Sequence, residues 1–300
     1  MAINGYIDIH THGIGRFDTR TGRPEDILEI AAMHGTAGGS AILPAIYPGP
    51  IEVMRMHMEA VRQAMESQKS QAVGRGSSAS IIGMHIEGPF LNPSKCGALD
   101  GSSFISPSQA SLKKLTEGYE DIIRIITIAP EIPGALKVIE KCVAMGIRVS
   151  MGHSDATYAQ AMKGKAAGAT GITHLFNAMR PFHHREPGLA GLGLIDEDLY
   201  IEVIADGVHL HPRTLELIFN RKRLDRIILV SDSVKSRRKK GLPVYSEKGV
   251  LAGSGITISD AIELLKGIGV PDAEITEAAV DNPARYIRMS KPATTQADSL

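Results

Sequence analysis

The sequence predicts an α/β protein, a (β/α)₈ TIM-like barrel of the metal-dependent hydrolase type, on three observations. Short runs rich in Ile and Val alternate with amphipathic segments along most of the 300 residues. Hydrophobicity within the runs is continuous, which is typical of strands buried on both faces of a parallel sheet. One barrel usually needs about 250 residues, so a single domain over residues 1–290 fits the length. An open doubly wound sheet is the alternative.

Eight strand-like runs follow one another in β-α alternation, which favours the closed barrel. The predicted strands are Tyr6–His10, Ser40–Leu43, Ile81–Glu87, Ile123–Ile128, Ile147–Gly152, Gly171–His174, Ile201–Ala205 and Ile227–Val230. The predicted helices are Pro24–Met33, Ile51–Glu66, Pro107–Glu117, Ala135–Met145, Tyr158–Ala167 and Pro212–Asn220. Gln68–Ala79, rich in Ser and Gly, is predicted to be a flexible loop. The polar tail Lys291–Leu300 is predicted to be disordered.

The charge balance argues against partners recognised by a global electric field. Lys plus Arg number 33, as do Asp plus Glu, so nothing attracts nucleic acid or an anionic membrane, and a local cluster must hold any anionic ligand. Cys96 and Cys142 provide no disulfide framework, which favours a reducing compartment. The opening MAINGYIDIHTHG does not resemble a signal peptide, and no apolar run approaches the roughly 20 residues of a membrane helix. We therefore expect a soluble cytoplasmic protein.

Histidines and carboxylates recur where the predicted strands end. In a barrel all of these ends lie on one face, which is where barrel enzymes carry out their chemistry. One histidine after a strand means little, but several at the same end are hard to explain as packing. The residues are His10 and His12 after the first strand, Glu87 after the third, His153 after the fifth, His174 after the sixth, Asp206 after the seventh and Asp232 after the eighth.

These residue types indicate a divalent metal centre. Imidazole and carboxylate suit Zn²⁺ or Fe²⁺, and three protein ligands with an open position define a hydrolytic site. Such an ion lowers the pKa of bound water towards roughly 7. A nearby carboxylate that is not a ligand can accept the water proton and return it to a leaving amine, and Asp232 is the natural candidate.

Each of these residues also has an ordinary interpretation. His10 and His12 could be turn residues, Glu87 a loop carboxylate, and His153 and His174 core histidines with satisfied hydrogen bonds; their common location favours the metal. His85 alternates with Glu87 and should point into the barrel, but has no assigned role. His34 and His57 lie in predicted helices and are expected at the surface.

Several motifs in order along the chain resemble the N-acetylglucosamine-6-phosphate deacetylase family of the amidohydrolase superfamily. The resemblance covers most of the chain, from His10 to about Met289, and the set of motifs is specific although each one alone is weak. The motifs are His85–Phe90 (HIEGPF), Gly152–Ser154 (GHS), Thr173–Met179 (THLFNAM), His183–Gly188 (HHREPG), Asp206–His209 (DGVH), Ser231–Ser233 (SDS) and Leu251–Ser254 (LAGS).

The resemblance implies a role for each matching residue. It implies metal ligation by Glu87, His153 and His174, proton transfer by Asp232, and a second-metal pair, which some members lack, at His10 and His12. It also implies substrate contacts at Asn177 and Ala178, and binding of the sugar phosphate and hydroxyls by Arg185 and His209. In the family the Arg can come from a dimer partner, so a homodimer is expected. Guanidinium suits phosphate because its planar fork binds two oxygens at once.

This sequence departs from the family pattern in three places. Family members normally carry a small β-sandwich made from both chain ends, and we expect this chain to lack it. The segment after Asp232 is short and holds a basic run, Lys235–Lys240, which is either a solvated loop or an aid to phosphate binding. Leu99 stands where many relatives have a histidine thought to polarise the scissile carbonyl. The leucine at this position puts the rate and the substrate identity in doubt.

The leading hypothesis is an enzyme that hydrolyses N-acetylglucosamine 6-phosphate to glucosamine 6-phosphate and acetate, with one or two zinc or iron ions. A related amidohydrolase acting on another N-acyl sugar phosphate is the second hypothesis. A metal-binding sugar-phosphate sensor with weak or no catalysis is the third. Retention of Asp232 argues against the sensor, which would have no use for a proton shuttle.

Overall fold

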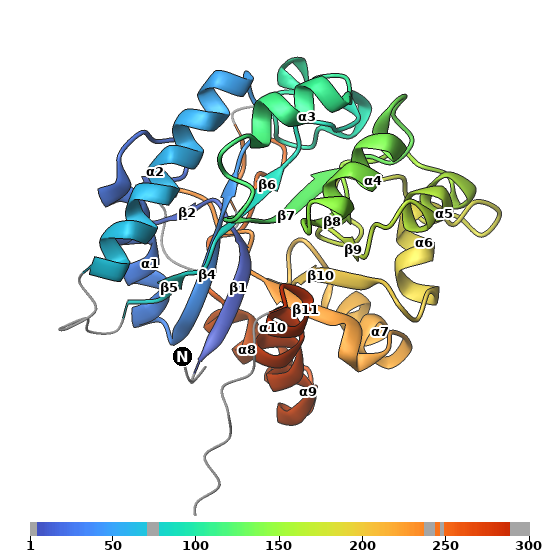
Figure 1. The fold of residues 1–300 in the computed structure, drawn as a ribbon. Helices are drawn as coiled ribbons and strands as arrows, with labels where there is room; N and C mark the ends of the chain where they lie inside the picture. The colour runs from blue at the N-terminus through green and yellow to red at the C-terminus, as the bar shows by residue number, and fades with distance from the viewer. Residues whose placement is uncertain (1–4, 71–77, 237–243, 247–248, 289–300) are drawn as a thin grey trace, which may run out of the picture.

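Eight parallel strands form a nearly closed barrel, and helices surround it (Figure 1). The computed structural model describes residues 5–70, 78–236, 244–246 and 249–288. The barrel strands, in spatial order, are β1 (Tyr6–Thr11), β4 (Gly39–Ile46), β6 (Met84–Glu87), β7 (Ile123–Ile128), β8 (Arg148–Met151), β9 (Gly171–Ile172), β10 (Tyr200–Ile204) and β11 (Ile227–Val230). The predicted barrel is confirmed, and the open sheet is not observed.

Helices follow most of the strands, as the alternation in the sequence predicts. The longer ones are α1 (Pro24–Thr36), α2 (Ile51–Ser70), α3 (Gln109–Thr116), α4 (Ala135–Ala144), α5 (Tyr158–Ala166), α6 (Gly188–Ile195), α7 (Pro212–Arg221) and α8 (Ile258–Gly267). The short ones are η1 (Pro93–Lys95), η2 (Gly101–Ser103), η3 (Leu224–Arg226), α9 (Asp272–Thr276), η4 (Glu277–Asp281) and α10 (Asn282–Tyr286).

Some local predictions need correction. The third predicted strand is two strands, β5 (Ser80–Ile81) and β6, because Gly83 between them has φ +141°, which interrupts the pairing. Gln68–Ser70, predicted as loop, complete helix α2. The Gln68 side chain accounts for this, since it donates to the Ala79 carbonyl and accepts from the Ile81 N–H. Residues 71–77 and the tail Lys291–Leu300 lie outside the described residues.

Apolar side chains form two layers, one on each side of the strands. The inner layer fills the barrel interior, and Tyr286, the last residue of α10, and Ile287 just after it contribute to this layer. The outer layer lies between the strands and the helices, where Ile, Val, Leu and Met side chains are almost completely buried. Burial on both faces explains the continuous hydrophobicity of the strands in the sequence.

The barrel closes between β1 and β11 at the end that carries the polar residues. There the backbone pairs through an isolated parallel bridge between Thr11 and Ser233. The His12 N–H donates to the Ser233 carbonyl at 2.8 Å, and the Asp232 N–H donates to the His10 carbonyl at 2.9 Å. The closure therefore places residues from the first and the last barrel strand side by side.

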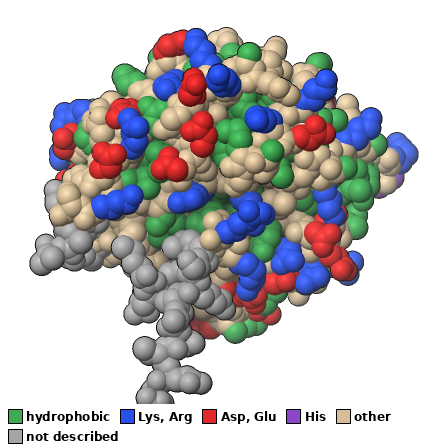
Figure 2. Space-filling model, in the orientation of Figure 1, with side chains coloured by type: hydrophobic (Ala, Val, Ile, Leu, Met, Phe, Trp, Pro, Cys, Tyr) green, Lys and Arg blue, Asp and Glu red, His purple; other side chains and the backbone are tan. Residues whose placement is uncertain are grey.

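The visible surface carries both signs of charge. Figure 2 shows Lys and Arg side chains interspersed with Asp and Glu over this face, in keeping with the zero net charge. Among the described residues, none of the helices combines the length and apolarity that crossing a bilayer requires.

Candidate active site

The residues singled out at the strand ends gather at one end of the barrel. His10, β1's penultimate residue, and His12 just beyond the strand lie beside Glu87, the last residue of β6. Two groups of side chains there have ligand atoms within 4.8 Å of one another: Glu87, His153 and His174, and His10, His12 and Asp232. Each group could hold a metal ion.

The first group converges on one oxygen of Glu87. The Nε2 atoms of His153 and His174 lie 3.1 and 3.2 Å from Glu87 Oε1, and 3.1 Å from each other. On the outer side of its ring, His153 Nδ1 donates to the Lys95 carbonyl at 2.9 Å. That bond fixes the tautomer, so the lone pair of Nε2 points at Glu87 and His174.

The second group lies against the other oxygen of Glu87. His12 Nε2 is 3.2 Å from Glu87 Oε2, 3.2 Å from His10 Nε2 and 3.7 Å from Asp232 Oδ1. The outer nitrogens are again anchored, with His12 Nδ1 on the Ala45 carbonyl at 3.1 Å and His10 Nδ1 on Glu202 Oε2 at 2.9 Å. The carboxylate of Glu87 thus connects the two groups.

The inward-facing nitrogen atoms are arranged as ligands of a metal ion and not as hydrogen-bond partners of one another. Because the outer nitrogens of His10, His12 and His153 donate to fixed acceptors, their inward Nε2 atoms carry lone pairs when the rings are neutral. Two lone pairs facing each other at 3.2 Å repel unless a cation lies between them. Ligands bound tetrahedrally to one zinc at about 2.0–2.1 Å stand about 3.3 Å apart, close to the observed spacing.

The electrostatics of the site also favour positive charge. Burial lowers the pKa of His10 to about 4, so this ring is neutral at pH 7, as a metal ligand must be. Burial acts on His174 in the same direction, but the hydrogen bond and charge of Glu87, with Asp232 and Glu202, raise its pKa to about 9. Burial would raise the pKa of Glu87, yet His153 and hydrogen bonds from the other histidines hold it well below its usual range.

The backbone at the strand ends is strained where these side chains enter the site. His153, His174 and Asp232 have φ values of +46°, +31° and +45°, and Ala178 has +48°. Residues other than glycine rarely adopt this left-handed backbone conformation, and strain of this kind concentrates at functional sites. The turns direct the three polar side chains towards the barrel mouth.

A pocket of about 240 Å³ opens directly over these groups. Asn177, Ala178 and His209, the expected substrate contacts, line it, and so does Leu99. Arg185 does not: it is exposed on the loop after β9, with Nη1 3.0 Å from His184 Nε2. The other lining residues are His12, Tyr47, Glu87, Gly97, Ala98, His153, His174, Asp232, Val250, Leu251, Ala252 and Gly253.

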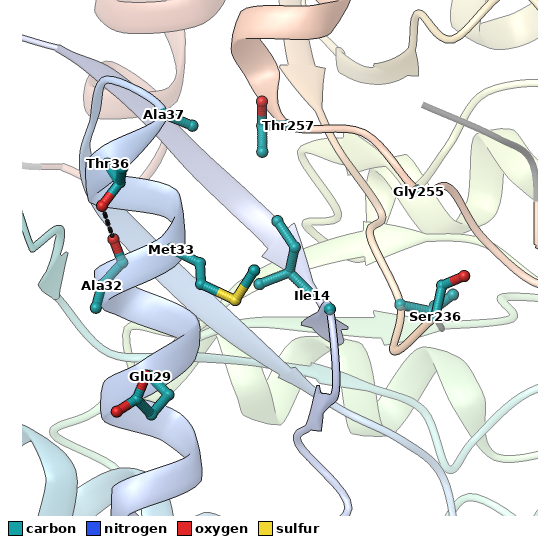
Figure 3. Close-up of a pocket in the computed structure, with 11 residues that line it drawn as sticks. Ile14, Glu29, Ala32, Met33, Thr36, Ala37, Ser236, Gly255 and Thr257 are labelled. Atoms are coloured by element: carbon teal, nitrogen blue, oxygen red, sulfur yellow. Dashed lines mark hydrogen bonds between the residues drawn. The ribbon is translucent and has the colours of Figure 1, made fainter. Parts of the chain in front are cut away.

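A larger cavity of about 510 Å³ lies apart from this chemistry, on the outside of the barrel. Figure 3 shows it between α1, with Glu29 and Met33, the short strand that holds Ile14, and the segment around Thr257. The described residues that line it include no histidine and one carboxylate, Glu29. We therefore place the active site at the smaller pocket.

Three histidines lie outside the two groups. The burial of two of them differs from what the sequence predicts, and the contacts of the third are now defined. His34 and His57, expected at the surface, are buried at 3% and 8% exposure, because their helices pack these faces on the sheet and on neighbouring elements. His85 is buried, as its alternation with Glu87 indicates, and its ring nitrogens contact the Ile9 carbonyl and Thr127 Oγ1. His85 also forms a third group with His10 and Glu202, whose ligand atoms lie within 4.8 Å of one another, and this group has no assigned role.

Two residues at the site were missed. Glu202 is buried in β10, and its Oε1 has no hydrogen-bond partner among the described residues, while Oε2 binds His10. Tyr47 follows β4 and stacks on His12 with ring centroids 3.8 Å apart. A lone carboxylate within a strand of Ile and Val is the signal that could have identified Glu202.

A barrel whose strand ends bring buried histidines and carboxylates together under a pocket has the architecture of a metal-dependent hydrolase. The chain belongs to the amidohydrolase family, which its sequence matches over residues 1–274. The family and the deacetylase relatives described next together identify the chain as a hydrolytic enzyme that acts on an amide.

The chain is also similar to individual members of this family. It is 32% identical to the N-acetylgalactosamine-6-phosphate deacetylase of Escherichia coli O157:H7, over 94% of this chain and 77% of that protein. Its identity to the N-acetylglucosamine-6-phosphate deacetylase of Lysinibacillus sphaericus is 30%, over 95% and 76%. The crystal structure of the Thermotoga maritima N-acetylglucosamine-6-phosphate deacetylase superimposes with a TM-score of 0.83 at 28% identity, over 95% and 78%. The family resemblance in the sequence is thereby confirmed.

Proposed function

We propose that this chain hydrolyses N-acetylglucosamine 6-phosphate to glucosamine 6-phosphate and acetate. The observation that carries the proposal is the position of Asp232, whose Oδ1 lies 3.7 Å from Nε2 of both His10 and His12 on the wall of the pocket. The names of the similar proteins support the substrate class. A Mycobacterium smegmatis deacetylase in complex with N-acetyl-D-glucosamine-6-phosphate superimposes with a TM-score of 0.84 at 27% identity, over 95% of this chain and 77% of that one.

The proposed metal is Zn²⁺ or Fe²⁺, held by Glu87, His153 and His174, with His10 and His12 available for a second ion. When bound, it polarises the amide carbonyl and lowers the pKa of the attacking water. The anchored outer nitrogens of the histidines hold the inward nitrogens in place without a change of tautomer.

Asp232 moves the proton in this proposal. Its carboxylate accepts a proton from the water as the water oxygen bonds to the acetyl carbon, and then delivers that proton to the amine nitrogen as the C–N bond breaks. The water oxygen ends in acetate, and the sugar leaves as the free amine. A sensor would not need a carboxylate in this position, which argues against that alternative.

The remaining pocket residues are proposed to hold the sugar. Asn177 and Ala178 contact the substrate. His209 Nδ1 donates to Asp206 Oδ2 at 2.7 Å, so its other ring nitrogen is an acceptor for a sugar hydroxyl. Arg185 lies outside the pocket of its own chain, so we propose that it acts on the pocket of a partner in a homodimer. A cytoplasmic location is also part of the proposal.

The 4-epimer N-acetylgalactosamine 6-phosphate is the second candidate substrate. The 32% identical relative from Escherichia coli O157:H7 carries that name, and Leu99 marks a departure at the reacting end of the pocket. The two sugars share the N-acetyl and phosphate groups and differ only in the direction of one hydroxyl.

Acetate release from both phosphorylated sugars and from unphosphorylated N-acetylglucosamine tests the proposal. We expect measurable hydrolysis, with a strong preference for a phosphorylated sugar. Equal rates with and without phosphate, or no acetate from any of the three with metal bound, would overturn it. The faster phosphorylated epimer identifies the substrate.

A further inference from the structure

The side chain of Tyr47 is held rigidly at the metal-binding end of the pocket. One face of its ring stacks on His12, with centroids 3.8 Å apart and an interplanar angle of 27°. The Arg20 guanidinium lies over the ring at 4.4 Å from its centroid, and must occupy the opposite face. Arg20 is itself fixed by Asp18, which accepts from its Nε at 3.0 Å and its Nη2 at 2.7 Å.

This stack determines where the phenol can be. His12 Nε2 is 3.2 Å from Glu87 Oε2, so the ring that covers His12 lies next to the ligand groups and not at the sugar end of the pocket. Tyr47 lines the pocket together with Leu99 and Asp232. Its hydroxyl forms no hydrogen bond with any of the residues that the structure describes, and remains available to a ligand.

Two other neutral side-chain donors among the described residues that line the pocket already bind protein acceptors. The Asn177 side-chain amide donates to the Leu175 carbonyl at 3.2 Å, and His209 Nδ1 binds Asp206 Oδ2. Leu99 offers no donor to the oxygen that becomes negative when water attacks an amide. A donor fixed in advance at that oxygen is worth about 10²–10³ in turnover in well-studied hydrolases.

We propose that Tyr47 is a catalytic residue whose hydroxyl donates a hydrogen bond to the acyl oxygen of the substrate, in the role that Leu99 cannot fill. The inference rests on the proposed amide hydrolysis. The phenol is a donor near neutral pH and loses no proton in the reaction. Its hydrogen bond strengthens as the carbonyl oxygen gains charge, so it acts on the transition state more than on binding of the ground state.

The test removes the hydroxyl and keeps the stack. Tyr47→Phe is expected to lower kcat by about 10²-fold with KM changed by less than about threefold, because the lost interaction is made in the transition state. Metal content is expected to stay at the wild-type level, since the phenyl ring still covers His12. Tyr119→Phe is the matched control. Two arginine guanidinium groups lie over the Tyr119 ring, at 4.8 and 5.1 Å from its centroid, but Tyr119 is outside the pocket. Removing its hydroxyl should leave kcat unchanged.

Leu99→His distinguishes a chemical role from a structural one. In the otherwise wild-type chain it is expected to change kcat by less than about threefold, because Tyr47 already supplies the donor. In the Tyr47→Phe background it is expected to restore kcat by at least about tenfold, a non-additivity that indicates a shared task. This rescue would not occur if Tyr47 only supported the fold.

The outcomes separate this inference from the proposed function. A wild type that releases acetate while Tyr47→Phe keeps kcat within about twofold overturns the role of the hydroxyl and leaves the function standing. The role of the hydroxyl is also overturned if Tyr47→Phe loses activity because it loses metal. It is likewise overturned if the effects of Tyr47→Phe and Leu99→His on kcat are additive. A wild type inactive on every N-acetyl sugar phosphate overturns both.

Discussion

The inward-facing histidines owe their orientation to partners that the sequence reveals only in part. Strand ends identified His10, His12, Glu87, His153 and His174, because parallel strands of a barrel must end on one face. Glu202 was missed because it lies inside a strand, where the rule of strand ends does not apply. Tyr47 was missed because the second strand was taken to end at Leu43, before Pro44, a residue that rarely continues a buried strand.

Asp232→Asn keeps the shape of the side chain and removes the proton acceptor. We expect kcat to fall by roughly 10²-fold or more, with metal content unchanged. Steady-state rates of acetate release, measured beside metal analysis of the same samples, check this. Asp272→Asn, an exposed aspartate on α9, is the control and should behave as wild type. Full activity of Asp232→Asn would assign the base to another residue.

Glu87→Ala and His174→Ala each remove one of the three converging ligand atoms. Two remaining ligands hold a divalent ion far more weakly than three, so we expect a sharp fall in bound metal and in activity. Metal content of protein purified without added metal is the measurement. The exposed His211→Ala serves as control. Full metal occupancy in both ligand variants would refute the assignment of this group.

Helix α1 fastens the closure between β1 and β11 through buried hydroxyls. His34 Nε2, on α1, is 3.1 Å from Thr11 Oγ1, which in turn is 2.8 Å from Ser233 Oγ. Ser233 Oγ accepts from Ser231 Oγ, which also contacts Asp8. Thr11 lies between His10 and His12 in the sequence, and Ser231 and Ser233 flank Asp232, so the hydrogen bonds hold the backbone next to the residues that enter the mouth. A closure with little regular ladder is therefore held by side chains.

This network predicts a pH-dependent contribution of His34 to stability. Burial lowers the pKa of His34 to about 4, against 6.5 for an ordinary histidine, so the unfolded chain binds the proton first as the pH falls. The contribution is complete above pH 6.5 and is lost between 6.5 and about 4. Relative to His34→Gln, the wild type should lose roughly 3 kcal/mol over that range. Urea unfolding of both proteins at pH 7 and at pH 4.5 measures this difference in stability. Asp8 is present in both proteins. Parallel curves of stability against pH would contradict the prediction.

Elements with a distinct run of apolar residues were predicted well, and those without a distinct hydrophobic pattern were missed. Strands β7 and β11 have the predicted bounds, and both are runs rich in Ile. Helix α6 has the sequence GLAGLGLI and is largely buried, so no polar face marks it as a helix. The hairpin of β2 (Gly13–Ile14) and β3 (Phe17–Asp18) has strands of only two residues, too short for any period.

The arrangement of charge and apolar surface over the whole molecule gives a reason to expect a second subunit. A neutral chain has no overall field to collect an anionic sugar, so the phosphate needs a local cation. Arg185, the residue matched to that role, is exposed outside its own pocket. Phe182, three residues before it, is 51% exposed, and Val208, beside the pocket residue His209, is 46% exposed. A contact between two copies at this face would bury such apolar side chains.

Mixed dimers test whether Arg185 acts across the interface. Arg185→Ala alone should mainly raise KM, because phosphate contacts are made in ground and transition states alike. When Arg185→Ala and Asp232→Asn chains are refolded or expressed together, a mixed dimer holds one site with both residues intact only if Arg185 reaches the partner's pocket. Random pairing then restores roughly a quarter of the wild-type kcat/KM. If Arg185 acts within its own chain, no site in the mixture contains both residues, and activity stays at the sum of the two variants. Sedimentation that shows only monomer at normal activity would likewise exclude the cross-subunit role.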